Sequence, residues 1–262
     1  MSYLQTILLG IIQGIAEFLP ISSSGHLVIA EALMHRFGLL EGSAEGNLQL
    51  NIALHFGTLL SILVIYFQDL LGLIKRPQVI LAIIVATAPL VIVAVLKDWY
   101  EAANTPFMAG IGLCITASLL FITPRIDGGT RPLDSIRLRD ALIIGLFQVV
   151  APLPGVSRSG TTIVAGLLTG LDRETAAKFS FLIAIPAILG ASVVEAKDLL
   201  EQPATGLELG PVLAGTVIAF LVGLASLKLL LRVIASRRLR MFGWYCLCVA
   251  WAVIIWQTVI LL

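Results

Sequence analysis

The chain has 262 residues, of which 58% are hydrophobic and 13% are charged, and its formal net charge at pH 7 is +1. Soluble domains are about half apolar and a quarter charged, so this composition, with a mean hydropathy of +1.01, excludes an ordinary soluble domain and predicts an integral membrane protein. The balanced charge argues against a nucleic-acid partner. No charged segment with a small-residue cleavage site precedes the first apolar run, so we expect no signal peptide.

The apolar stretches of the chain fall into two length classes. Six are long enough, or nearly so, to cross about 30 Å of hydrocarbon as helices: residues 50–68, 78–97, 106–123, 176–195, 210–231 and 242–262. Four are too short or too interrupted to cross alone: residues 3–19, 25–35, 140–152 and 159–171. The short stretches form two adjacent pairs, each joined by a serine-rich bend. Because irregular backbone at membrane depth is tolerated only inside protein or beside a wet cavity, each pair is predicted to form a re-entrant hairpin.

The two pairs look like copies of one unit. The segment "QGIAEFLPISSSG" at 13–25 aligns without a gap with "QVVAPLPGVSRSG" at 148–160, and the Gln, the Ala, two Ser and the Gly are identical. Each pair precedes three predicted crossings, and this odd number makes the second hairpin enter from the opposite face. The alternative is that small-residue hairpins recur by chance. We predict an all-α polytopic membrane protein with one domain, 1–262, that is an inverted-topology repeat of two halves, about 1–123 and 136–262. Each half is a re-entrant helix hairpin plus three transmembrane helices.

The basic residues predict the orientation of the chain. Three of them, Arg36, Lys97 and Lys197, lie on the side of the N-terminus. The opposite side holds thirteen: Lys75, Arg76, Arg125, Arg131, Arg137, Arg139, Arg173, Lys178, Lys228, Arg232, Arg237, Arg238 and Arg240. Because cytoplasmic loops carry the excess of Lys and Arg, both termini are predicted to face outward.

The first bend carries polar groups in the middle of an apolar sequence. Gln13 and Glu17 are four residues apart, so they share one face of the first half-helix. His26 is predicted to open the next half-helix, with Ser23 or Ser24 placed to cap it. A hydrogen-bonded packing role is the alternative for His26.

The second bend places a cation in the corresponding position. Its tip, residues 157–160, contains Arg158, and Thr162 lies four residues further on, where it would project beside the arginine if the helix begins near Ser157. Two helix N-termini would thus converge, each with free N–H groups and the positive end of its dipole. Arginine adds a planar fork that suits phosphate oxygens. The sequence therefore predicts a binding site for a phosphate-like anion.

Two intramembrane charges need an explanation. An Arg or Asp at the centre of a bilayer costs about 2.5–3.5 kcal/mol on insertion scales, so Glu17 and Arg158 should be paired or functional. The alternative to a functional site is a structural ion pair that locks the two halves together. A carboxylate repels phosphate, so Glu17 must be protonated, act as a base at some distance, or reach the phosphate through a cation. We infer a divalent cation, Mg²⁺ or Ca²⁺, held by Glu17 and substrate oxygens.

Weaker signals lie on the long helices. Asn51 and His55 share a face, where they would line the cavity or bond to a neighbouring helix. The small-residue patches at 57–61 and 190–194 are typical of helix–helix contacts, and such patches also allow a homodimer.

These residues resemble the undecaprenyl-pyrophosphate phosphatase family, also known through bacitracin resistance, over essentially the whole chain. The resemblance is carried by a (Glu/Gln)-x-x-x-Glu pattern at Gln13 and Glu17, by "PISSSGH" at 20–26 and by "PGVSRSGTT" at 154–162. It implies hydrolysis of undecaprenyl diphosphate to undecaprenyl phosphate and inorganic phosphate, which recycles the lipid carrier for cell-wall synthesis. It also implies re-entrant helices, dependence on a divalent metal, and an active site on the periplasmic side of the bacterial cytoplasmic membrane.

The resemblance also implies which residues form the site. The catalytic residues would be Glu17, Ser23, His26 and Arg158, with Glu17 also the metal ligand. The substrate would be bound by Gln13, Ser22, Ser24, Gly25, Ser157, Ser159, Gly160 and Thr162. Some family members have Glu where this chain has Gln13, which leaves Glu17 as the main metal ligand.

The identity of the nucleophile stays open in the sequence. His26 would form a phosphohistidine, or act as the base for Ser23 or for water. We favour His26 and Ser23 acting together, with Glu17 orienting the metal or the base. The prenyl tail of the substrate would lie between helices, in contact with membrane lipid.

Two other classes share parts of this pattern. A lipid-phosphate transporter or flippase would use the same midplane anion site, but a pure carrier needs no acid and no general base such as Glu17 and His26. The phosphatidic-acid phosphatases need a second histidine after their "SR" motif, and no histidine follows His55 here.

Overall fold

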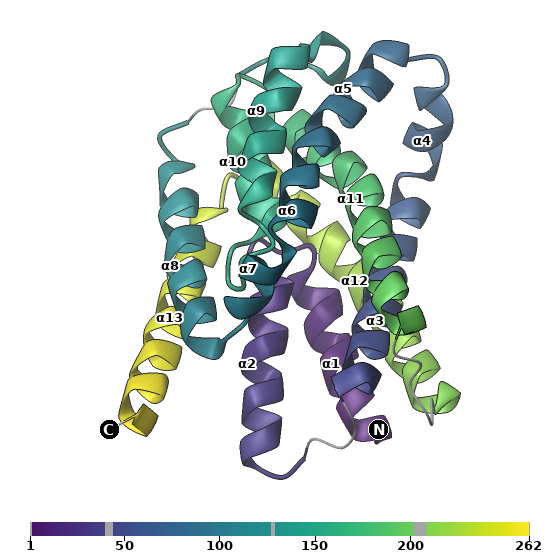
Figure 1. The fold of residues 1–262 in the computed structure, drawn as a ribbon. Coiled ribbons are helices and arrows are strands. Elements are labelled where there is room, and N and C mark those ends of the chain that lie inside the picture. The colour runs from purple at the N-terminus through teal and green to yellow at the C-terminus, as the bar shows by residue number, and fades with distance from the viewer. Residues whose placement is uncertain (1, 40–43, 127–128, 202–207, 262) are drawn as a thin grey trace.

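The computed structural model of the chain is a bundle of helices (Figure 1). It describes residues 2–39, 44–126, 129–201 and 208–261. The last residue of the predicted stretch 242–262, and parts of the loops on the side of the N-terminus, lie outside the described residues. Among the described residues no strand occurs, and the one extended pairing is an isolated bridge between Arg131 and Leu171. The predicted all-α class is confirmed.

The helices of the first half follow the predicted stretches closely. They are α1 (Tyr3–Ala16), α2 (Ser23–Arg36), α3 (Ala44–Ile65), α4 (Phe67–Leu73), α5 (Pro77–Thr87), η1 (Ala88–Leu90), α6 (Val91–Val95), α7 (Lys97–Ala102) and α8 (Pro106–Ile122). Those of the second half are η2 (Leu133–Ser135), α9 (Leu138–Val149), α10 (Arg158–Leu168), α11 (Arg173–Glu201), α12 (Leu209–Ala235) and α13 (Arg240–Leu261).

Among the described residues, five segments are long and apolar enough to cross a membrane, where the sequence predicted six. They are Leu48–Ile65, Pro77–Val95, Arg173–Glu195, Leu209–Ala235 and Arg240–Val259. The sixth prediction, 106–123, became α8, whose 17 residues span roughly 26 Å and so fall short of the hydrocarbon thickness. The second span is interrupted, because Pro89 has no N–H to donate and a short 3₁₀ turn separates α5 from α6 there. The length and apolar character of these helices make the chain a multi-pass membrane protein.

The four short helices form two hairpins that point toward each other. The helices α1 and α2 have 14 residues each, whereas α9 has 12 and α10 has 11, so none is longer than roughly 21 Å. In Figure 1 the α1–α2 pair extends from the end that holds the N-terminus, and the α9–α10 pair extends from the opposite end. Both connecting bends lie between the two ends.

The long helices pack reciprocally around these hairpins. The first hairpin helix α1 and the crossing helix α3 both pack on α12. The corresponding helices of the second half, α9 and α11, both pack on α5. The α1–α12 and α3–α12 contacts are close because they are lined by glycine: a Cβ at Gly10 or at Gly57 would lie 2.5 Å from a backbone oxygen of α12. The predicted helix contact at 57–61 is therefore confirmed, whereas a Cβ at Gly190 would meet nothing within 4 Å.

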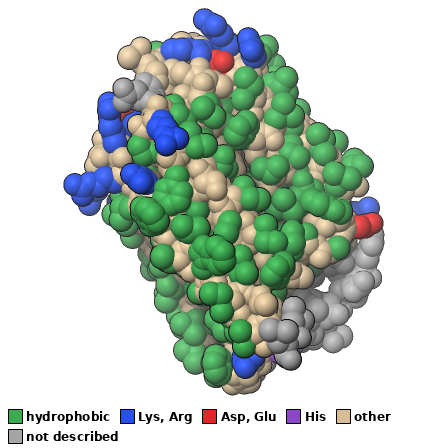
Figure 2. Space-filling model, turned by 90° about the vertical axis from the view of Figure 1, so that its left-hand side faces the viewer, with side chains coloured by type: hydrophobic (Ala, Val, Ile, Leu, Met, Phe, Trp, Pro, Cys, Tyr) green, Lys and Arg blue, Asp and Glu red, His purple; other side chains and the backbone are tan. Residues whose placement is uncertain are grey.

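The end of the bundle opposite the N-terminus carries most of the basic residues. Figure 2 shows Lys and Arg side chains gathered at one end of a largely hydrophobic surface. The loop before α9 is fixed there by Arg131, whose guanidinium donates to Asp140 at 2.6 Å and to the carbonyl of Thr169 at 3.0 Å. The pairing ties the start of α9 to the end of α10, so this hairpin is clamped at its open end.

Candidate active site

The first bend is built around a serine cap. α1 ends at Ala16, and the chain turns through residues 17–21 before α2 begins. The Ser22 hydroxyl accepts a hydrogen bond from the Gly25 N–H at 3.2 Å and lies 3.3 Å from the Ser24 hydroxyl. The prediction that Ser23 or Ser24 caps this helix was wrong: the cap is Ser22, which takes a φ of +70°. That backbone conformation is rare for residues other than glycine, so surrounding contacts must stabilise it.

The second bend repeats the same cap. The Ser157 hydroxyl accepts from the Gly160 N–H at 3.1 Å and lies 3.2 Å from the Ser159 hydroxyl. α10 begins at Arg158, directly after Ser157, as the sequence predicted. The gapless alignment of the two segments therefore corresponds to the same cap hydrogen bonds in both bends, although Ser157 has an extended backbone with a φ of −79° where Ser22 has +70°.

A residue of α8 holds the second bend in place. The Thr116 hydroxyl donates to the Gly155 carbonyl at 2.8 Å and accepts from the Ser157 N–H at 2.9 Å. Gly155 has a φ of +86°, and a Cβ there would collide with the backbone of α8, so only glycine fits this close approach.

The two bends are in direct contact. Arg158 of the second bend donates to Glu17 Oε1 of the first at 2.5 Å. The Ser159 hydroxyl donates to the Leu19 carbonyl at 3.4 Å, and a Cβ at Gly25 would lie 2.6 Å from Gly155 Cα. The prediction that the serine-rich bends meet is confirmed, although their residues are about 135 positions apart in the alignment of the two segments.

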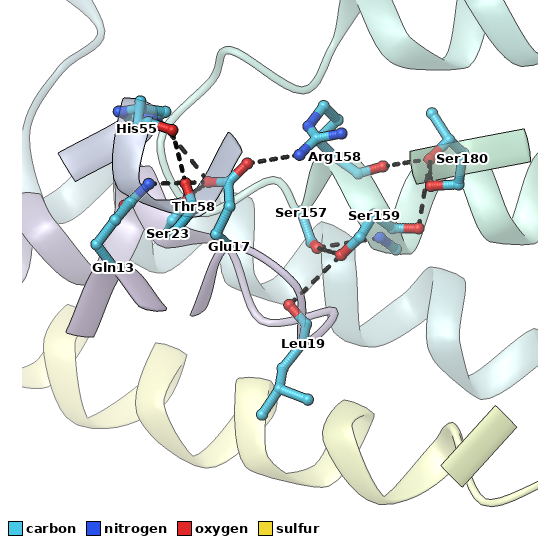
Figure 3. A network of polar contacts seen from close by, with 12 residues as sticks. Gln13, Glu17, Leu19, Ser23, His55, Thr58, Ser157, Arg158, Ser159 and Ser180 are labelled. Atoms are coloured by element: carbon cyan, nitrogen blue, oxygen red, sulfur yellow. Dashed lines mark hydrogen bonds and ion pairs between the residues drawn. The ribbon is translucent and has the colours of Figure 1, made fainter. Parts of the chain in front are cut away.

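Glu17 is the centre of the contacts at this junction (Figure 3). Its Oε2 accepts from the Ser23 hydroxyl at 2.7 Å and from Gln13 Nε2 at 3.2 Å. His55 of α3 places its Nε2 3.9 Å from the same oxygen. The Glu17 side chain is only 5% exposed, so a carboxylate withdrawn from water is held by donors from three different elements.

Two polar atoms at this junction are buried without a hydrogen-bond partner: Arg158 Nη1 and Gln13 Oε1. Buried polar atoms without a partner are rare in proteins and require a specific reason. A guanidinium N–H and an amide oxygen beside a carboxylate are, respectively, a donor for a phosphate oxygen and an oxygen ligand for a divalent cation. No group of three or more His, Cys, Asp and Glu side chains surrounds a common point in the described residues. A cation here would therefore use Glu17, the Gln13 amide oxygen and oxygens of the substrate.

Two of the predicted site residues face elsewhere. His26 Nδ1 lies 2.8 Å from the Ser22 carbonyl, and Nε2 lies 2.9 Å from the hydroxyl of Tyr245 in α13, whose ring stacks on the imidazole. Since a carbonyl only accepts, Nδ1 carries the proton and Nε2 accepts from Tyr245. The Thr162 hydroxyl lies 2.6 Å from that of Ser180 and donates to the backbone carbonyl of Arg158 at 2.8 Å. Any role of His26 in the chemistry requires its contact with Tyr245 to open.

Four residues near the junction were left out of the predicted site: Thr116, Ser180 and Tyr245 were not singled out, and His55 was expected only to line the cavity or bond to a neighbouring helix. They lie on α3, α8, α11 and α13, and each touches a bend residue only because of how these helices pack. Asn51 and His55 were seen to share a face, and this was the only sequence signal for any of the four.

Comparison with known proteins places the chain in one family. Residues 6–252 match the family described as "Bacitracin resistance protein BacA". The chain belongs to this family. The BacA match covers both bends and the long helices up to residue 252 within α13, so the junction lies entirely within the part that the family shares.

Bacterial relatives cover nearly the same length. A protein of Rhodopirellula baltica named "Undecaprenyl-diphosphatase" is 42% identical over 248 residues, which is 93% of this chain and 94% of the relative. A protein of Carboxydothermus hydrogenoformans with the same name is 39% identical over 251 residues, or 94% of each chain. One from Alkaliphilus metalliredigens, again with this name, is 39% identical and covers 94% of this chain and 95% of its own. These names give no support to the transporter alternative for this BacA family member.

Proposed function

We propose that this protein hydrolyses undecaprenyl diphosphate to undecaprenyl phosphate and inorganic phosphate, and so recycles the lipid carrier for cell-wall synthesis. Membership of the BacA family and the names of its relatives support this activity. The observation that carries the proposal is the junction itself, where Arg158 from one bend meets the Glu17–Ser23 pair from the other. A hydroxyl, a base and a cation with a free donor are the parts that phosphoryl transfer needs.

We place the attack on Ser23, because its hydroxyl donates directly to Glu17, whereas the ring nitrogens of His26 contact the Ser22 carbonyl and the Tyr245 hydroxyl. The Ser23 oxygen bonds to the terminal phosphorus, its proton passes to Glu17, and the bond from that phosphorus to the bridging oxygen breaks. Undecaprenyl phosphate leaves with the electrons of that bond. Water then attacks the serine-bound phosphorus, the bond from phosphorus to the Ser23 oxygen breaks, and the proton held by Glu17 returns to the serine as inorganic phosphate departs. Arg158 and the N–H groups at the two capped helix starts would hold the charged oxygens of the transition state.

A divalent cation, Mg²⁺ or Ca²⁺, completes the proposal. The diphosphate brings two or three negative charges, and one arginine with two helix dipoles offsets only part of them. Glu17 and the unpartnered Gln13 Oε1 would hold the ion together with substrate oxygens. Such an ion supplies charge neutralisation at the phosphoryl group.

Purified protein in detergent micelles, supplied with undecaprenyl diphosphate and Mg²⁺, is expected to release one phosphate per substrate molecule. Excess EDTA should abolish the release, and added Mg²⁺ or Ca²⁺ should restore it, because the carboxylate and the diphosphate otherwise repel each other. A colorimetric phosphate assay with undecaprenyl phosphate as the control substrate measures both effects. Absence of phosphate release from the diphosphate would contradict the enzymatic proposal. Full activity in EDTA would contradict the cation alone.

We further propose that the two hairpins are re-entrant and that the fold is an inverted repeat, with both termini and the active site on the outer face of the cytoplasmic membrane. The hairpin helices are too short to cross, they extend from opposite ends of the bundle, and their packing on α12 and α5 is reciprocal. The basic residues gather at the end away from the termini, which is the cytoplasmic end by the positive-inside rule.

Cysteine labelling in intact cells tests this orientation. In a variant with Cys114, Cys246 and Cys248 replaced by alanine, a Phe37→Cys probe should react with a membrane-impermeant maleimide, since Phe37 is exposed beyond the end of α2. An Asp134→Cys probe in the same background should react only after the cells are permeabilised. The reverse pattern would contradict the proposed orientation.

A further inference from the structure

His55 is the group at the junction that the proposed chemistry leaves without a role. It lies on α3, outside both bends, and its side chain is 31% exposed while that of Glu17 is 5% exposed. The imidazole therefore lies between the buried carboxylate and the outside of the bundle. Figure 3 shows His55 beside Glu17 and Gln13, on the side of the carboxylate away from Arg158.

The hydrogen bonding of His55 fixes which nitrogen faces the carboxylate. Nδ1 lies 2.9 Å from the carbonyl of Asn51, one turn earlier on the same helix, so Nδ1 carries a proton and donates to that oxygen. Nε2 of the neutral ring then turns a lone pair toward Glu17 Oε2. Two electron-rich atoms that face each other are unfavourable, so either a proton on Nε2 or a cation between the two atoms must compensate them. Metal-binding histidines have this same arrangement, in which the second ring nitrogen donates to a backbone carbonyl.

The distance between the two atoms fits a shared metal ion. His55 Nε2 and Glu17 Oε2 are 3.9 Å apart, which is too long for a hydrogen bond. Two ligand atoms that are each about 2.1 Å from one ion lie about 3.0 Å apart at a coordination angle of about 90° and about 3.6 Å apart at about 120°, so a bound ion would draw these two atoms together by a few tenths of an ångström. The unpartnered Gln13 Oε1 is a third ligand atom on a residue that already contacts Glu17.

We infer that His55 Nε2 is a ligand of the divalent cation at this site, together with Glu17 and Gln13, and that the site consequently prefers a first-row transition ion such as Mn²⁺ to Mg²⁺ or Ca²⁺. An imidazole nitrogen adds affinity for transition ions that an all-oxygen site lacks, because Mg²⁺ and Ca²⁺ are hard ions that favour oxygen. This inference rests on the proposed function, since it names the metal class for the same site.

Mn²⁺ is the probe, because its electron spin reports directly on bound nitrogen. Pulsed electron paramagnetic resonance of the purified protein with Mn²⁺ alone should show coupling to a directly bound nitrogen. Labelling the protein with ¹⁵N only at histidine should replace the ¹⁴N coupling by a ¹⁵N coupling, and this measurement needs no mutation. His26, His35 and His55 are the three histidines of the chain, so few assignments compete.

The His55→Gln variant should lose the nitrogen coupling and bind Mn²⁺ at least about tenfold more weakly, while its affinity for Mg²⁺ changes less. His35→Gln is the matched control, because His35 is exposed at the end of α2, and it should keep both the coupling and the affinity. Absence of coupling in the wild type, or its persistence in His55→Gln, would overturn the inference. Phosphate release is measured separately: release without nitrogen coupling removes the His55 ligand and leaves the enzymatic proposal standing, whereas a protein that releases no phosphate contradicts that proposal whatever its coupling.

Discussion

Replacing Arg158 by alanine is expected to abolish nearly all phosphate release. Removal of one donor that stabilises transition-state charge lowers kcat by about 10²–10³-fold in enzymes. Arg158 is the only basic side chain that contacts Glu17 at less than 3 Å among the described residues, and its Nη1 is free for a phosphate oxygen. Phosphate release under saturating substrate, with the variant at equal concentration, measures the loss.

The same substitution should also destabilise the fold, and this effect must be separated from catalysis. Glu17 would keep its buried charge without its partner, which costs about 3–5 kcal/mol in comparable buried pairs. The double variant Glu17→Gln, Arg158→Ala removes both charges, so its melting temperature in detergent should recover while turnover stays lost. Arg158→Lys keeps the charge without the planar fork and should retain only part of the activity. Wild-type turnover in Arg158→Ala would remove this residue from the mechanism.

A methyl group at Gly25 is expected to separate the two bends. The Cβ of an alanine there would lie 2.6 Å from both Cα and N of Gly155, and the obstacle is backbone, which cannot rotate away. Overpacking of this kind costs about 1–3 kcal/mol, and a misplacement of about 1 Å at a reacting group can lower turnover about 100-fold. Gly25→Ala should therefore lower both the melting temperature and the rate of phosphate release.

Gly190→Ala is the matched control for this substitution. Gly190 lies within α11, and a Cβ there would meet nothing within 4 Å. Alanine is favoured over glycine inside a helix by about 1 kcal/mol, so this variant should melt at the same or a slightly higher temperature and keep full turnover. Equal melting temperatures and equal turnover in the two variants would contradict a role of the close contact between the bends in stability and catalysis.

The sequence predicted the elements that depend on local pattern. The four short helices and the pairing of Gln13 with Glu17 on one face follow from spacing within a few residues, and α10 starts close to the assumed position near Ser157. The meeting of the bends followed from counting crossings between two similar segments. The predicted crossing at 106–123 is α8, which is shorter than a full span. The order of the elements is nevertheless the predicted one, so the expectation that the bends meet was unaffected.

What the sequence missed depends on packing between distant helices. The contact of Tyr245 with His26 joins residues 219 positions apart, and that of Thr116 with Gly155 spans 39 positions. No periodicity within one helix predicts which face of α13 or α8 meets a bend. The cap at Ser22 was missed for a different reason: its φ of +70° is a conformation that serine rarely adopts, so the pattern favoured the serines that follow it.

The two serine-capped bends differ at one position of their aligned runs, SSSG at 22–25 and SRSG at 157–160. Between the two neighbouring serine hydroxyls of each bend, the first bend carries Ser23 and the second carries Arg158, while the surrounding hydrogen bonds are the same. Under the proposed mechanism the two similar bends would therefore have different parts, with Ser23 attacking the phosphorus and Arg158 holding the phosphate oxygens. Neither half would be competent by itself, so a damaging change in one cannot be compensated by the intact counterpart.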